Sequence, residues 1–200
     1  MKRVDRRHDA FGLEIASFFE GGRPFEIVER DDGYIDAANS TGQYFAEYEQ
    51  WPDRQKRGMK YVRGPHVLDV GCGAGRVSLY LQSRGFRNFG LFGNPTKAKR
   101  LLKQLHGMTS DSAVLMAETI DPYRTTNPLH RQHLQRNRQQ GRMPGQIRIR
   151  IRFQRVAGAW FDYLFVSLNE MKDILNGSGW TVTRLFNDSD PAYVAVIDKI

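Results

Sequence analysis

The sequence predicts a single α/β domain, because short apolar strands alternate with amphipathic helices along the chain. An apolar run at 67–70 leads through glycines into a helix expected over 76–84. A second run, at 113–117, is typical of a strand that is covered on both faces. Two more strands are expected at 180–186 and 192–198, around a polar turn. We therefore expect a sheet with helices on both faces and a C-terminal antiparallel hairpin.

Length and composition fit one domain with a sizeable core. The 200 residues are 40% hydrophobic and 26% charged, which is ordinary for a globular protein. No segment approaches the ~18 consecutive apolar residues of a membrane span, so no membrane partner is expected. The basic start of the chain lacks the apolar stretch of a secretory signal. A single cysteine excludes an internal disulfide framework, and together these features predict a cytoplasmic protein.

We divide the chain into a front region, residues 1–64, and a core, residues 65–200. The front region should contain a helix over 10–20 that begins at Asp9 and ends at two glycines. The apolar side of that helix is expected to be formed by Phe11, Ile15, Phe18 and Phe19. A hairpin over 26–36 with its turn at Asp32-Gly33 should follow. Two further helices are expected at 42–50 and 52–62.

The second half of the core has clear local signals. Asn94 and Pro95 should open a helix whose apolar face consists of Ala98, Leu101, Leu102 and Leu105. Asn127-Pro128 begins a polar helix that ends at Gly141, and Ser167 with Glu170 forms a capping box before a helix that runs to Leu175. Residues 146–155 alternate between apolar and basic side chains, which predicts a half-buried strand with a hairpin partner at 160–166.

The most informative segment is the glycine-rich turn Asp69-Val-Gly-Cys-Gly-Ala-Gly75. Its glycines let the backbone turn sharply, approach a ligand closely and pack the following helix against the strand. Unpaired N–H groups at the start of that helix favour an anionic or strongly polar ligand. Cys72 lies inside the turn. Because no activating base stands beside it in sequence, we interpret it as a small residue in a tight space and not as a nucleophile.

This segment resembles motif I of the class I S-adenosylmethionine-dependent methyltransferases. The glycines follow a Gly-x-Gly-x-Gly spacing and not the Gly-x-Gly-x-x-Gly of nicotinamide enzymes. The resemblance implies a Rossmann-like sheet, S-adenosylmethionine as cofactor and transfer of its methyl group to an unidentified small-molecule acceptor. It also implies that the cofactor's methionine end is held by Asp69, Gly71, Cys72, Gly73 and Gly75, with Asp69 near the amino group.

The resemblance names no catalytic side chain in this sequence. Such enzymes act largely by holding the nucleophile and the methyl sulfonium in line, so a side-chain base is not obligatory. The sequence also leaves the oligomeric state open.

The middle of the chain is short for this family. Three further strand–helix units, of ~30 residues each, precede the strand that 113–117 resembles. Only 36 residues lie between Gly75 and Ser112. In one interpretation, residues 89–95 are the second strand and its turn, which places Phe92 where the family has its ribose-binding acid. In the other interpretation, which we favour, residues 88–94 resemble the loop after the family's fourth strand. About 50 residues, which carry strands two to four in the family, are then absent from this chain near 87–88.

Both interpretations predict an incomplete sheet without the acid that binds the cofactor's ribose. A lost buried hydrogen-bonding partner costs ~1–3 kcal/mol, so weakened cofactor binding is expected. A degenerate, weakly active or inactive methyltransferase is therefore an alternative. Asn94 could supply one polar contact to the cofactor, although a helix cap is its first expected role.

An arginine-rich insertion at 121–155 carries the whole net charge of +8, because it contains nine arginines and one acidic residue. Arg148, Arg150 and Arg152 lie on one face of the strand expected at 146–155. They could bind nucleic acid through its phosphates, which gives a third hypothesis of a nucleic-acid-binding or nucleic-acid-methylating protein. The alternative is a solvated strand protected from edge-to-edge pairing by its charge.

The remaining candidates are weaker. His130 and His133 lie three residues apart on a polar helix without a nearby acid or cysteine, so they predict solvated side chains and no metal site. Glu118 and Asp121 flank the end of a core strand, where sites in open α/β sheets gather, but turn and capping roles are the alternative. Tyr34 and Tyr44 could cover the pocket or pack in the core.

Overall fold

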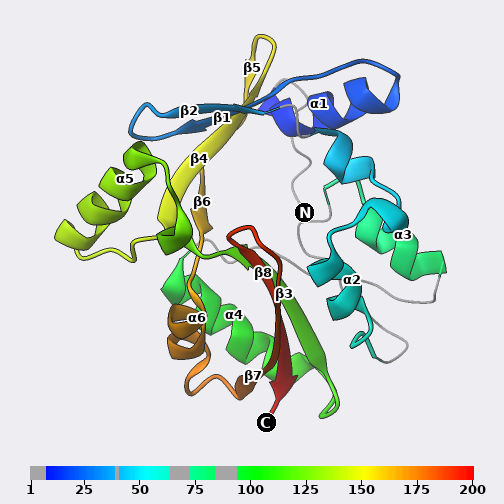
Figure 1. Cartoon of the computed structure of the whole chain (residues 1–200), viewed down its shortest axis with the longest axis vertical. Helices are drawn as coiled ribbons and strands as arrows, with labels where there is room; N and C mark the ends of the chain where they lie inside the picture. Colours follow the sequence, from blue (N-terminus) through cyan, green and yellow to red (C-terminus); the bar gives the residue numbers. More distant parts are fainter. Residues whose placement is uncertain (1–7, 39–40, 64–72, 84–93) are drawn as a thin grey trace.

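The computed structural model of the chain describes residues 8–38, 41–63, 73–83 and 94–200 (Figure 1). The strand expected at 67–70 and the segment 84–93 lie outside these residues. Within them, the strands form two antiparallel sheets, here called the core sheet and the front sheet. No helix among the described residues is long and apolar enough to cross a membrane.

The core sheet contains three strands in the order β3–β8–β7. These are β3 (Val114–Ile120), β7 (Trp180–Asn187) and β8 (Ala192–Lys199). The middle strand, β8, is antiparallel to both neighbours, so β3 and β7 run parallel to each other. The expected C-terminal hairpin is therefore confirmed, and its second strand inserts between the first strand and β3.

Helices cover both faces of the core sheet, as the sequence predicted (Figure 1). On one face, α4 (Pro95–Met108) and α6 (Leu168–Leu175) bury a cluster that includes Leu102, Leu115 and Ala195. On the other face lies α2 (Asp53–Met59), whose Gly58 sits directly on the side chain of Val194. A methyl group on Gly58 would lie 2.9 Å from Val194 Cγ1, so the glycine allows this close approach.

The front sheet joins two segments that are far apart in the sequence. The hairpin strands β1 (Glu26–Arg30) and β2 (Ile35–Ala38) pair with each other, and β1 also pairs with β4 (Gln146–Phe153). Strand β4 further pairs with β5 (Val156–Ala157) and β6 (Phe161–Leu164). The arginine-rich strand therefore lies inside the front sheet, with the front hairpin on one side.

Three further α-helices lie within the described residues. Asp9 caps α1 (Ala10–Phe19), which packs on β4. Asn127 caps α5 (Pro128–Gln139), and α3 (Arg76–Ser83) follows the glycine turn. Their positions agree with the helices expected from the sequence.

Two predictions for the front region are wrong in detail. The buried residues of α1 are Ala10 and Glu14, whereas Phe19, assigned to the apolar side, is 80% exposed. Phe18, which was assigned to the same side, stacks on the ring of Phe45. The helix expected at 42–50 is a pair of short 3₁₀ segments, η2 (Thr41–Phe45) and η3 (Tyr48–Gln50). The helical pattern in the sequence identified α1 but not the side on which neighbouring segments would pack.

Candidate functional site

The glycine turn keeps the backbone conformation that the sequence requires at its two described glycines. Gly73 and Gly75 have φ angles of +56° and +83°, in the left-handed region that side chains other than glycine rarely adopt. The carbonyl of Gly75 accepts a hydrogen bond from the Leu79 amide, 2.7 Å away, at the start of α3. The other predicted members of the turn, Asp69, Gly71 and Cys72, lie outside the described residues.

The two glycines differ in what surrounds them. A methyl group on Gly75 would have no described atom within 4 Å. A methyl group on Gly73 would lie 3.0 Å from Tyr44 Cδ1, so the tyrosine ring covers this side of the turn. The structure thus brings Tyr44, from η2, onto the turn.

Tyr44 is held by an acidic residue of the front sheet. Its hydroxyl donates to Glu26 Oε1 over 3.3 Å, and Phe11 contacts its ring edge-on at 5.3 Å between centroids. Burial, together with the nearby charge of Glu26, raises the pKa of the Tyr44 phenol well above its usual value. Tyr44 is therefore a hydrogen-bond donor, and not a base, across the neutral pH range.

Glu14, on α1, is a second buried acid in this region. One carboxyl oxygen accepts a hydrogen bond from the Thr41 hydroxyl, and the other has no hydrogen-bond partner in the described structure. Burial raises the pKa of Glu14 above its usual value, although the bond from Thr41 opposes this. A carboxyl on the apolar side of a predicted helix was not identified from the sequence, because its partner lies on another segment.

Arg76 begins α3 immediately after the turn. Its Nη2 donates to Gln55 Oε1 over 3.1 Å, and its guanidinium carbon lies 4.9 Å from the ring centroid of Trp51. Trp51 is 3% exposed, and both it and Tyr48 contact Tyr80 on α3. Burial lowers the pKa of the Arg76 guanidinium. The aromatic cluster therefore fixes α3 and its first residue against the front region.

Glu118, near the C-terminal end of β3, bonds to two side chains of α2, one of which is the Gln55 that contacts Arg76. Its two carboxyl oxygens accept from Arg54 Nε at 3.0 Å and from Gln55 Nε2 at 2.6 Å. Asp121 instead accepts from the Tyr123 amide as the cap of η4 (Pro122–Arg124). Of the two acids that flank this strand, Glu118 lies in the candidate site and Asp121 has the capping role.

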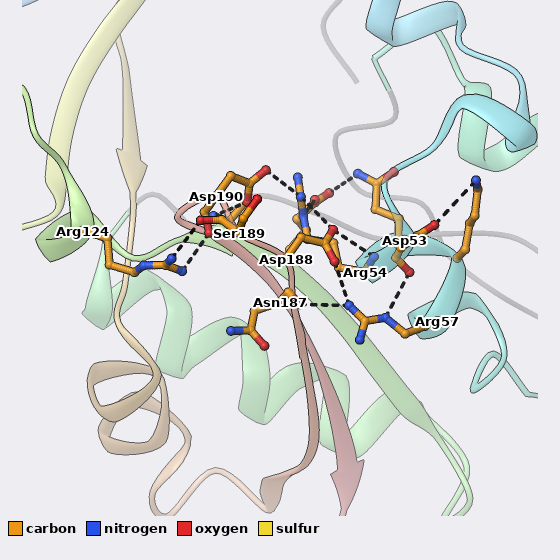
Figure 2. A network of polar contacts seen from close by, with 12 residues as sticks. Asp53, Arg54, Arg57, Arg124, Asn187, Asp188, Ser189 and Asp190 are labelled. Carbon is orange, nitrogen blue, oxygen red and sulfur yellow. Dashed lines mark hydrogen bonds and ion pairs between the residues drawn. The ribbon is translucent and has the colours of Figure 1, made fainter.

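An ion-pair network docks α2 on the loop between β7 and β8 (Figure 2). Arg54 also pairs with Asp188 at 3.3 Å and with Asp190 at 2.8 Å. Arg57 pairs with Asp188 at 2.8 Å and donates to the Asn187 carbonyl. Burial opposes the charge of Arg54, but the bonds to its carboxylate partners outweigh that effect and raise its pKa. This network joins the front region to the end of the core sheet.

Asn94 has the helix-capping role that the sequence first predicted. Its side-chain oxygen accepts from the Lys97 amide over 2.9 Å. Lys97 itself pairs with Asp162 of β6 at 3.0 Å, so the start of α4 is attached to the front sheet. The contact of Asn94 with a cofactor stays a prediction.

Two of the three strand arginines, Arg150 and Arg152, have an ion-pair partner within the protein. Arg150 makes two bonds with Glu29, at 2.9 and 3.0 Å, and Arg152 contacts the same carboxylate. These hydrogen bonds lower the pKa of Glu29 to about 2. Arg148 is exposed.

The two histidines of α5 differ from the solvated pair that the sequence predicted. His133 is 8% exposed and bonds through Nδ1 to Asp32 at 3.1 Å, so that prediction is wrong for His133. His130 is partly buried and packs edge-on against Tyr34. Tyr34 thus lies beside α5. Among the described residues, no three His, Cys, Asp or Glu side chains form a group suited to a metal ion.

Comparison with solved structures identifies the fold. The chain matches an S-adenosylmethionine-dependent methyltransferase of Bacteroides fragilis, crystallised with S-adenosyl-L-homocysteine. The TM-score is 0.79 at 15% identity, over 99% of this chain and 98% of that one. A S-adenosylmethionine-dependent methyltransferase of Methanosarcina mazei matches 72% of this chain and 97% of its own, with a TM-score of 0.54 at 13% identity.

No protein-family model and no curated protein matches the sequence. The likeness is therefore one of fold, and on that basis the chain has the α/β fold of the S-adenosylmethionine-dependent methyltransferases. The fold class predicted from the sequence is confirmed.

Proposed function

We propose that this chain is an S-adenosylmethionine-dependent methyltransferase that acts on a small-molecule acceptor. The observation that carries the proposal is the left-handed glycine pair at 73 and 75, which precedes α3 in a fold that matches such an enzyme from end to end. The absence of any described atom within 4 Å of an added methyl at Gly75 supports this, because a cofactor-binding turn needs that space for its ligand.

The left-handed backbone of Gly73 and Gly75 supports a role of this turn in binding the methionine end of the cofactor. Gly73 and Gly75 would shape the backbone around it, and Asp69, Gly71 and Cys72 complete the turn in the sequence. When bound, S-adenosylmethionine supplies an activated methyl group on a sulfonium. The protein's part is to hold that methyl group and the acceptor in line and to keep water out.

Isothermal calorimetry with S-adenosylmethionine and S-adenosylhomocysteine tests the proposal. A functional enzyme should bind both at micromolar concentration and transfer labelled methyl groups to members of a small-molecule panel. Absence of any binding heat would refute an active enzyme. It would instead support a degenerate homologue, and grafting an acidic second-strand segment should then restore affinity.

A second candidate, nucleic-acid binding, is favoured by Arg148, which is exposed and has no ion-pair partner within the described ranges. Arg150 and Arg152 would first have to leave Glu29. Binding of this kind should weaken steeply with salt and be lost in an Arg148→Ala/Arg150→Ala/Arg152→Ala variant. An affinity for RNA and DNA that this variant leaves unchanged would remove the candidate.

A further inference from the structure

Arg76 is a partly buried cation beside the glycine turn, and among the described residues its guanidinium touches no carboxylate, although the charge of Glu118 acts on it from the far side of Gln55. Burial of a cation is costly, and buried guanidinium groups are usually paired with carboxylates. Among the described residues, Arg76 donates to the neutral amide oxygen of Gln55 and lies over the face of Trp51. No carboxylate pairs with Arg76 in the part of the chain that the structure describes.

The hydrogen bond of the Gln55 NH₂ group sets the orientation of the Gln55 side-chain amide. Its NH₂ group donates to Glu118 Oε2 over 2.6 Å, which leaves its oxygen directed to Arg76. An amide can make this bridge because it has a donor and an acceptor, whereas a carboxylate at position 55 would repel Glu118 and neutralise Arg76. The amide therefore holds the guanidinium without cancelling its charge.

Glu118 is itself fixed by Arg54. The Arg54 side chain is 10% exposed and reaches two loop carboxylates as well as Glu118, so its position does not depend on one bond. Figure 2 shows the Arg54 side chain reaching from α2 toward the loop that carries Asp188 and Asp190. A continuous chain of contacts thus runs from that loop through Arg54, Glu118 and Gln55 to Arg76 at the turn.

We propose that Gln55 is a positioning residue of the cofactor site, which holds the Arg76 guanidinium, in contact with no carboxylate of the described chain, so that it meets the carboxylate of the bound cofactor. This inference rests on the proposed function. Arg54 and Glu118 act through Gln55: Arg54 holds Glu118 in place, and Glu118 fixes the direction of the Gln55 amide. The cofactor carboxylate would then be the anion in direct contact with the Arg76 guanidinium.

The test compares the affinity for S-adenosylhomocysteine, measured by calorimetry, with thermal stability in matched variants. Gln55→Glu keeps a hydrogen-bond acceptor for Arg76 but cancels its charge, so the Kd should rise about tenfold. Gln55→Glu/Glu118→Gln restores a donor–acceptor pair between positions 55 and 118. Its Tm should recover relative to the single variant while its Kd remains high.

Arg57→Gln is the control, because it loosens the same loop from α2 without touching Glu118, Gln55 or Arg76. It should lower the Tm and leave the Kd unchanged. A Kd in Gln55→Glu equal to that of the wild type, or a Kd that recovers with the Tm in the double variant, would overturn the positioning role alone. A wild type that does not bind S-adenosylhomocysteine would overturn the proposed function, and this inference with it.

Discussion

Gly75→Ala separates the backbone role of the glycine turn from its role toward a ligand. At a φ of +83°, an alanine costs ~1–2 kcal/mol in backbone strain, and no described atom lies within 4 Å of the added methyl. Among the described residues, the strain is therefore the only cost of the added methyl to the fold. For a domain of this size, it should lower the Tm by about 2–8 °C.

Gly177→Ala is the matched control. Gly177 has a φ of +72°, equally open surroundings among the described residues, and a place after α6, away from the turn. The two variants should lose similar stability. If the added methyl at 75 displaces one contact with the ligand, worth ~1–3 kcal/mol, the Kd for S-adenosylhomocysteine should rise about 5- to 150-fold in Gly75→Ala alone.

Both quantities are accessible in one set of samples, by scanning calorimetry for the Tm and by titration calorimetry for the Kd. Equal Kd values for the two variants and the wild type would refute the assignment of Gly75 to the cofactor site. A much larger loss of Tm in Gly75→Ala than in Gly177→Ala would refute the claim that its surroundings are open.

Three further predictions concern the elements around the site. Asn94→Ala should cost ~1 kcal/mol of stability through loss of the α4 cap, and an unchanged Kd for S-adenosylhomocysteine would show that Asn94 does not contact the cofactor. Glu29 should titrate with a pKa near 2 by NMR and nearer its usual 4.5 in Arg150→Gln. Because the folded-state pKa is depressed, the stability from this pairing is present above pH 4.5 and is lost as the pH falls toward 2. Leu102→Ala should cost ~2–5 kcal/mol, and Leu101→Ala less, because Leu102 is buried and Leu101 only partly so; chemical denaturation checks both.

Elements with local signals could be predicted from the sequence. The cap at Asn94, the capping box of Ser167 and Glu170, and the hairpin turn at Asp32-Gly33 all depend on residues within three positions of each other. The same is true of the helix after the glycine turn. In each case one side chain or one backbone preference decides where the element begins.

The partners of charged residues could not be predicted in this way. Arg54 reaches Glu118 and Asp190, which are 64 and 136 residues away in sequence, and no local pattern marks them as a set. The burial of His133 depends on Asp32 from the front hairpin. Gln55 was missed for the same reason, since its two partners lie on β3 and α3.

The arginine-rich strand is best understood through the pairing of β1 with β4. In that register Glu29 stands opposite Arg150, and its carboxylate takes up two of the three arginines on the strand's basic face. Glu26, on the same strand β1, holds Tyr44 against the glycine turn, and β6, paired with β4, is attached to α4 through Asp162. The basic strand thus secures the sheet whose Glu26 holds Tyr44 over the turn. This gives the arginines a structural role beside the proposed cofactor site that does not require nucleic acid.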